Sequence, residues 1–146
     1  MRFQRANYLV SDKERALLLY REVLGMELEY LKDSPADSYS YEVFDIDPAL
    51  AIEFATLSYQ GQPRVLALTI LGAGNLAPPP SPRRSAIVIE VESVEATVTA
   101  CQGHGFKCFR VDQLVTPDGR EGKEAGILDD DGNLVVIYNI EKYPEA

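Results

Sequence analysis

Residues 11–26 have the sequence SDKERALLLYREVLGM and follow a stretch from Phe3 to Val10 that is typical of a strand. Ser11 and Glu14 have the spacing of a capping box, in which a hydroxyl and a carboxylate satisfy the first backbone N–H groups of a helix. Apolar residues then recur at helical spacing, and Gly25 suits the left-handed end of a helix. This stretch therefore predicts a strand followed by a helix.

The same pattern returns in the second half of the chain. Residues 87–91 alternate as a strand does, and Ser93 is placed to cap a helix that ends at Gly103 or Gly105. Further strands are expected after each helix, at residues 26–31, 49–57 and 64–71 in the first half and at residues 106–111, 121–128 and 134–140 in the second. Residues 39–44 are expected to form another strand or to extend the second one. The order in each half is therefore βαβββ.

A proline-rich segment, residues 72–83, separates the two halves and carries prolines at 78, 79, 80 and 82. These prolines exclude a helix or a central strand, so the segment is expected to be a stiff linker. We expect a single domain over residues 1–146, made of two modules at residues 1–71 and 84–141. The repeated unit cannot close its own core, which implies that the two modules pack together.

The composition excludes several classes of protein. The formal charge of −9 argues against nucleic-acid binding, which needs a basic surface. No apolar stretch approaches the roughly 18 residues that span a membrane, and no apolar signal region follows the first residues. We therefore expect a cytoplasmic protein without a membrane partner. Cys101 and Cys108 are too few for a disulfide scaffold, and each is expected to be a small buried side chain.

Two motifs resemble signatures of the vicinal oxygen chelate superfamily, which includes glyoxalase I, bleomycin resistance proteins, fosfomycin resistance enzymes and extradiol dioxygenases. Residues 11–26 resemble its opening pattern D-x-x-x-A-x-x-F-Y-x-x-V-L-G. Residues 128–134, LDDDGNL, resemble its closing pattern D-P-D-G-N, with Asp130 in place of proline. The resemblance implies an α+β fold in which two tandem βαβββ modules form a curved mixed sheet around a cup.

In enzymes of this superfamily the cup usually holds a divalent metal, with ligands from the first and last strands of each module. The resemblance assigns four positions here, occupied by Arg5, by one of Leu68, Thr69 or Ile70, by Ala86 (Ser85 in a shifted register) and by Val136. Another register puts Glu53 at the second position. Since a catalytic metal needs about three His, carboxylate or thiolate ligands, and Arg5 would repel a cation, we expect no metal and no other cofactor.

Alternation along the strands predicts which polar side chains face the cup. These candidate ligand-binding residues are Arg5, Asn7, Glu53, Glu90 and Tyr138. An arginine in a partly dry cavity needs a counter-charge or an anionic ligand. Either Glu53 or Glu90 pairs with Arg5, or these residues bind a ligand, and the sequence leaves both open. Tyr39, Tyr41 and Tyr59 are expected near the rim, where they suit an organic ligand or a subunit interface.

The sequence thus predicts a metal-free protein that binds a small organic molecule, with drug or metabolite sequestration like that of the bleomycin resistance proteins as one role. A homodimer is expected, because exposed strand edges tend to be paired or covered and the resemblance implies dimers. The alternative is a glyoxalase-like lyase or isomerase, or a dioxygenase-related enzyme, that uses Glu53, Tyr138 or Arg5. A third possibility is an interaction protein that uses the fold only to dimerise.

Overall fold

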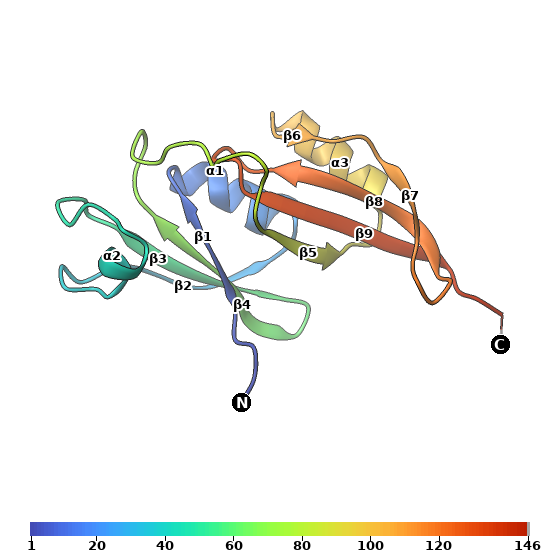
Figure 1. The fold of residues 1–146 in the computed structure, drawn as a ribbon, viewed down its shortest axis with the longest axis horizontal. Coiled ribbons are helices and arrows are strands. Elements are labelled where there is room, and N and C mark those ends of the chain that lie inside the picture. The colour runs from blue at the N-terminus through green and yellow to red at the C-terminus, as the bar shows by residue number, and fades with distance from the viewer. Residues whose placement is uncertain (146) are drawn as a thin grey trace. The chain divides into compact units, whose positions relative to one another are not determined.

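The computed structural model describes residues 1–145 and divides into two compact units. The first unit spans Met1–Ala77 and the second begins at Pro78 (Figure 1). The boundary lies inside the predicted linker, where the chain forms only short turns and bends. Each unit holds its own mixed sheet, so the expected α+β class is confirmed.

The first unit contains a four-stranded sheet in the order β1-β4-β3-β2. Strand β1 (Ala6–Val10) runs parallel to β4 (Gln62–Ile70). Strand β3 (Glu53–Tyr59) lies antiparallel to both β4 and β2 (Glu27–Asp33). The first strand of the unit is therefore paired with its last, as a closed βαβββ order requires.

The predicted helix after β1 is present but differs in detail. An α-helical segment, α1 (Lys13–Leu17), continues directly into a π-helical segment, η1 (Leu18–Val23). The cap is Asp12 rather than Ser11, because the Asp12 carboxylate accepts a hydrogen bond from the backbone N–H of Arg15 at 3.0 Å. Gly25 follows with a φ of 78°, the left-handed conformation expected at the helix end.

The expectation of a strand at residues 39–44 is wrong, since this segment forms a short helix, α2 (Ser40–Val43). The helical turn brings the Tyr41 hydroxyl to the carbonyl oxygen of Leu50, to which it donates at 2.6 Å. Tyr41 and Leu50 also pack against a small buried cluster of Ile46, Ile52 and Leu71. These contacts override the strand propensity of the aromatic and β-branched residues. They also delay β3 to Glu53, four residues after its predicted start.

The second unit contains a five-stranded sheet in the order β5-β9-β8-β6, with β7 also paired to β8. The parallel pair is β5 (Ala86–Glu90) and β9 (Leu134–Lys142), and β8 (Glu121–Leu128) lies antiparallel to β9. The strand expected at residues 106–111 is interrupted, leaving β6 (Lys107–Cys108) and a separate β7 (Asp112–Val115).

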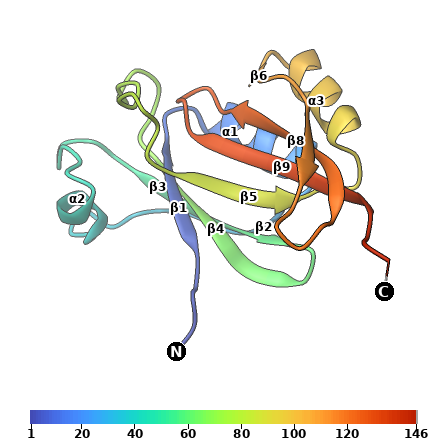
Figure 2. The same ribbon diagram turned by 45° about the vertical axis from the view of Figure 1, so that its right-hand side comes forward.

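Helix α3 (Val94–Gly103) begins where the sequence predicts, because the Ser93 side chain accepts from the backbone N–H of Ala96 at 3.1 Å. In Figures 1 and 2 this helix lies alongside β6 and β8. Its side chains Val94, Val98 and Cys101 are buried, whereas Cys108 on β6 is half-buried.

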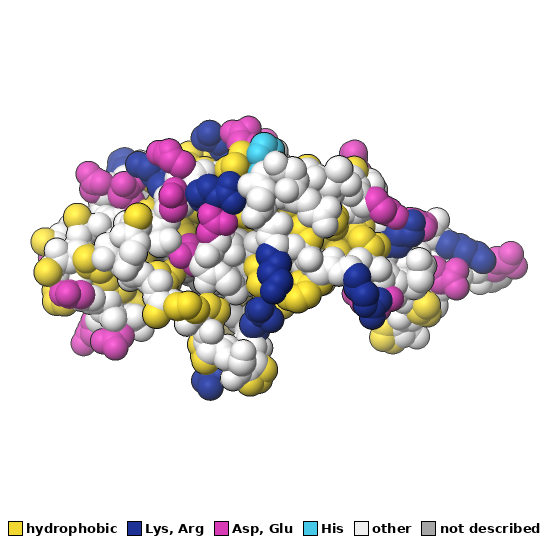
Figure 3. All heavy atoms as spheres, turned by 90° about the horizontal axis from the view of Figure 1, so that it is seen from above, with side chains coloured by type: hydrophobic (Ala, Val, Ile, Leu, Met, Phe, Trp, Pro, Cys, Tyr) yellow, Lys and Arg dark blue, Asp and Glu magenta, His cyan; other side chains and the backbone are white. Residues whose placement is uncertain are grey.

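The first sheet is buried on both faces over much of β3 and β4, whereas the second sheet has one buried face and one more open face. In the first unit one buried face carries Tyr8, Val10, Leu66 and Leu68, and in the second the buried face carries Ala125, Ile127, Val135 and Ile137. Figure 3 shows acidic and basic side chains interspersed over the viewed surface. Within residues 1–145, no helix is long and apolar enough to cross a membrane.

Candidate functional site

The face of the first sheet opposite Tyr8 and Val10 carries a reciprocal polar pair. Asn7 is aligned with Ala67 on β4, so Asn7 and Thr69 project on the same face. The Asn7 amide donates to the Thr69 hydroxyl oxygen at 3.2 Å, and the Thr69 hydroxyl can donate back to the Asn7 amide oxygen at 3.2 Å. Asn7 thus lies on the face of the sheet opposite Tyr8 and Val10. Its role in ligand binding stays a prediction.

Arg5 lies immediately before β1 and is half-buried. Its Nε donates to the backbone carbonyl oxygen of Arg64 at 3.3 Å. The guanidinium is therefore hydrogen-bonded to the backbone near the start of β4 rather than paired with a carboxylate of the first unit.

The expected orientation of Glu53 is wrong. Glu53 is aligned with Ile70, and Ile70 is aligned with Val10, so Glu53 lies on the same face of the sheet as Val10. There its carboxylate pairs with the Lys13 ammonium at 3.2 Å, which excludes the predicted Arg5–Glu53 pair. Alternation misled the prediction because residues 55–59 are buried on both faces of β3.

The predicted aromatic rim is also only partly correct. Tyr39 is 71% exposed, but Tyr59 is 7% exposed and belongs to the core. Tyr41 is half-buried and uses its hydroxyl to hold Leu50. Only Tyr39 of the three presents the open aromatic surface that was expected.

The second sheet places Glu90 and Tyr138, two of the candidate ligand-binding residues, side by side. Tyr138 on β9 is aligned with Glu90 on β5 and with Glu124 on β8. Burial, followed by a hydrogen bond to Glu90, raises the pKa of the Tyr138 phenol. The phenol therefore stays protonated at neutral pH and acts as a hydrogen-bond donor.

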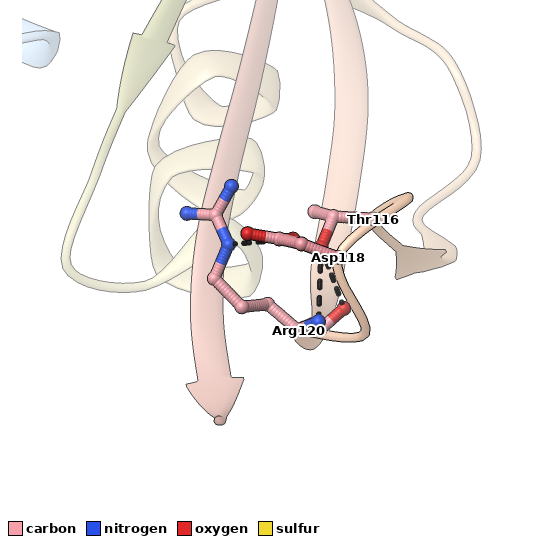
Figure 4. A network of polar contacts seen from close by, with 3 residues as sticks. All are labelled: Thr116, Asp118 and Arg120. Carbon is pink, nitrogen blue, oxygen red and sulfur yellow. Dashed lines mark hydrogen bonds and ion pairs between the residues drawn. The ribbon is translucent and has the colours of Figure 1, made fainter. Parts of the chain in front are cut away.

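Arg120 joins this row from the loop between β7 and β8, and the sequence analysis missed it. Its Nε donates to Asp118 at 3.1 Å and its backbone N–H donates to the Thr116 hydroxyl oxygen at 2.9 Å (Figure 4). Hydrogen bonds from Thr116 and then Arg120 lower the pKa of Asp118. The Arg120 charge also acts on Tyr138. Residues 117–119, Pro-Asp-Gly, signal the turn but not the direction of the arginine that follows it.

A groove of about 730 Å³ opens on the same face of the second sheet. Its lining includes Phe109, Arg110, Asp112, Glu124, Gly126 and Val136. Phe109 lies over Gly126, where an added Cβ would come within 2.9 Å of the phenyl Cδ2. Arg110 and Asp112 pair at 3.0 Å. Phe109 and Arg110 line the groove from a segment that is not a strand, although the sequence predicted one there.

The positions that the resemblance assigns to metal ligands do not suit a divalent cation. In the second module the fourth ligand position, Val136, is aligned with Val88 on β5. The repeat that matches Val10 with Val91 matches Val88 with Asn7 in the first module, so the residue aligned with Asn7 is the counterpart of Val136. Because Asn7 is aligned with Ala67, the second position is Ala67 rather than Leu68, Thr69 or Ile70. Arginine, alanine and valine side chains supply no metal ligand. Among residues 1–145, no cluster of three or more His, Cys, Asp or Glu side chains is arranged to hold a metal ion.

Comparison with known proteins gives a consistent result. The model of the Glyoxalase/Bleomycin resistance protein/Dioxygenase superfamily matches residues 2–137. A glyoxalase family protein from Bacillus cereus is similar over 97% of this chain and 95% of its own, with 14% identity and a TM-score of 0.74. No curated protein matches the sequence.

Two further solved structures resemble this chain. The trypanothione-dependent glyoxalase I of Leishmania major is 23% identical, with a TM-score of 0.66 over 95% of this chain and 86% of its own. The fosfomycin resistance protein FosX of Listeria monocytogenes, solved with Mn(II) and sulfate, is 12% identical, with a TM-score of 0.58 over 92% of this chain and 88% of its own. At these identities the likeness concerns the fold.

Proposed function

Because this chain belongs to the Glyoxalase/Bleomycin resistance protein/Dioxygenase superfamily, we propose that it is a metal-independent binding protein for a small organic molecule. Membership alone does not decide the chemistry, since one fold carries many functions. The choice depends on the residues at the positions where the metal enzymes hold their cation.

One observation carries the proposal: Arg5, Ala67, Ala86 and Val136 occupy those positions. Three of these side chains have no donor atom, and the fourth is a permanent cation that repels a metal ion. These four residues therefore cannot hold a divalent cation for catalysis. We derive no catalytic step through a metal.

The groove of the second unit supports small-molecule binding. Its volume of about 730 Å³ lies within the range of about 300–1,000 Å³ found for ligand sites. Phe109, Gly126 and Val136 supply apolar lining, and Arg110, Asp112 and Glu124 supply polar groups. This mixture of a mainly apolar lining with a few polar groups is typical of sites for organic ligands.

The protonated state of Tyr138 favours binding over the enzymatic alternative. A general base should have a pKa near the working pH, whereas burial and Glu90 raise the pKa of Tyr138. The phenol O–H is already used in its hydrogen bond with Glu90, so Tyr138 is poorly suited to take a proton from a substrate. We propose sequestration of a drug or metabolite, the role suggested by the bleomycin resistance branch of the family name.

Native mass spectrometry of freshly purified protein tests this function. The expected spectrum contains a species heavier than the protein alone, at 16.2 kDa per chain, by the mass of an organic molecule, and that mass is lost on collisional activation. Denaturation and small-molecule mass spectrometry of the released fraction identify the compound. A species heavier by one metal ion, or turnover of the released compound, would contradict a metal-independent binding protein.

A further inference from the structure

Two cationic side chains lie near the ring of Phe109 in the second unit. The Cζ of Arg83 lies 5.5 Å from the centroid of its ring, and the Nζ of Lys107 also lies 5.5 Å from it. Both distances fall within the range of about 6 Å for a cation–π contact. Arg83 precedes β5 and Lys107 belongs to β6, which are the opposite ends of the strand order β5-β9-β8-β6. The two side chains therefore converge over one face of the sheet.

Neither cation has an acidic partner. Within residues 1–145, Arg83 and Lys107 form no ion pair, although acidic residues outnumber basic ones by 23 to 14 in the chain. The nearby carboxylate of Asp112 is already paired with Arg110 at 3.0 Å. Because both charged groups lie 5.5 Å from the centroid of one ring, they form one cationic patch that an anion can contact.

The cations are adjacent to the groove. Phe109 and Val136 both line it, and Phe109 is held over Gly126 by a hydrogen bond from its backbone N–H to the Gly126 carbonyl oxygen at 2.8 Å. Phe109 is 38% exposed and both cations are exposed, so a ligand can reach all three side chains. Phe109 therefore connects the apolar lining of the groove with the two cations, and Glu124 is also part of that lining.

We propose that this groove binds a small organic anion, an oxyanion attached to an apolar ring. The oxyanion lies between Arg83 and Lys107, and the ring lies beside Phe109 and Val136. Arginine suits this role because its guanidinium can hold a carboxylate or a phosphate with two parallel hydrogen bonds. The inference rests on the proposed function and specifies the class of ligand.

Titration by NMR with four probes tests the inference: benzoate, phenyl phosphate, benzylammonium and inorganic phosphate. Benzoate and phenyl phosphate should shift the backbone amide signals of Phe109 and Val136 and bind at least about tenfold more tightly than benzylammonium, a difference of about 1.4 kcal/mol. The ratio of benzoate to phenyl phosphate affinity tells whether the natural oxyanion is a carboxylate or a phosphate, and either ratio supports the inference.

The double variant Arg83→Gln/Lys107→Gln should lose at least about tenfold in affinity for benzoate and phenyl phosphate. Lys32→Gln is the matched control, since Lys32 lies 5.1 Å from the ring of Tyr30 in the first unit. This control should bind both probes as the unaltered protein does. Both altered cations are exposed, so the melting temperature should not change in either variant.

Several results would overturn the inference. These are equal or tighter binding of benzylammonium, undiminished binding by the double variant, the absence of amide shifts with either aromatic anion, or inorganic phosphate binding as tightly as phenyl phosphate. The proposed function is judged separately, by the organic molecule that co-purifies. A neutral or cationic co-purified molecule would refute the anion class and leave metal-independent binding intact.

Discussion

Two glycines of β8 offer a sharp test of the second sheet, because the same substitution meets different neighbours at each. At Gly122, an added Cβ would lie 1.8 Å from the Asn139 carbonyl oxygen, 2.9 Å from its carbonyl carbon and 3.0 Å from the Ile140 Cα. All three atoms belong to the backbone of β9. Relief of the clash must therefore separate the two strands.

At Gly126 the nearest atoms belong to side chains, with the Phe109 Cδ2 at 2.9 Å and the Leu134 Cδ1 at 3.4 Å. The ring of Phe109 is 38% exposed and can rotate outward. A crowding cost of about 1 kcal/mol is then largely offset by the gain of about 0.4–1 kcal/mol that alanine brings by restricting the unfolded chain.

We therefore expect Gly122→Ala to lower the free energy of unfolding by about 3 kcal/mol or more, the upper range for overpacking. At about 2–4 °C per kcal/mol, its melting temperature should fall by about 6–12 °C. Gly126→Ala should stay within about 1 kcal/mol of the original protein. Urea denaturation and thermal melts followed by circular dichroism measure both variants. Equal stability of the two variants would refute the alignment of β8 with β9.

Three further predictions concern stability, reactivity and assembly. Arg5→Ala should lower the free energy of unfolding, measured by urea denaturation, by about 1 kcal/mol, because the hydrogen bond to the Arg64 carbonyl oxygen is lost. A decrease of about 3–5 kcal/mol would instead indicate that Arg5 belongs to a buried ion pair, which would contradict the pairing of Glu53 with Lys13. Burial raises the pKa of Cys101 to about 12, so iodoacetamide at pH 8 should not modify this thiol in the native protein but should modify it in protein unfolded in urea. Peptide mapping that finds Cys101 alkylated in the native protein would contradict its burial. We also propose a homodimer, for which light scattering should give twice the chain mass; a mass of 16.2 kDa at micromolar concentration would refute it.

The sequence predicts the parts of the fold whose signals are local. The helix at residue 94 follows from a Ser93 cap and a regular apolar period, and strands β5 and β9 follow from their alternating apolar residues. Where tertiary contacts compete with local propensity, prediction fails. Residues 39–44 look like a strand, yet the bond from Tyr41 to Leu50 favours a helical turn.

The candidate site is less predictable, because its residues converge from irregular segments. Glu53 was assigned to the wrong face since β3 is buried on both sides and alternation carries no information there. Arg83 and Phe109 lie outside regular strands, and Arg120 follows a turn. Their directions depend on backbone geometry that spacing in the sequence does not encode.

The most direct test of metal-independent binding is elemental analysis after incubation with zinc, nickel, iron and manganese, followed by desalting. We predict far less than one metal ion per chain, because Arg5, Ala67, Ala86 and Val136 supply no metal ligand. The double variant Ala86→His/Val136→Glu is the positive control, since it places two ligand types on one face of the second sheet, and it should retain more zinc than the original protein. One tightly bound metal ion per unaltered chain would contradict the central claim.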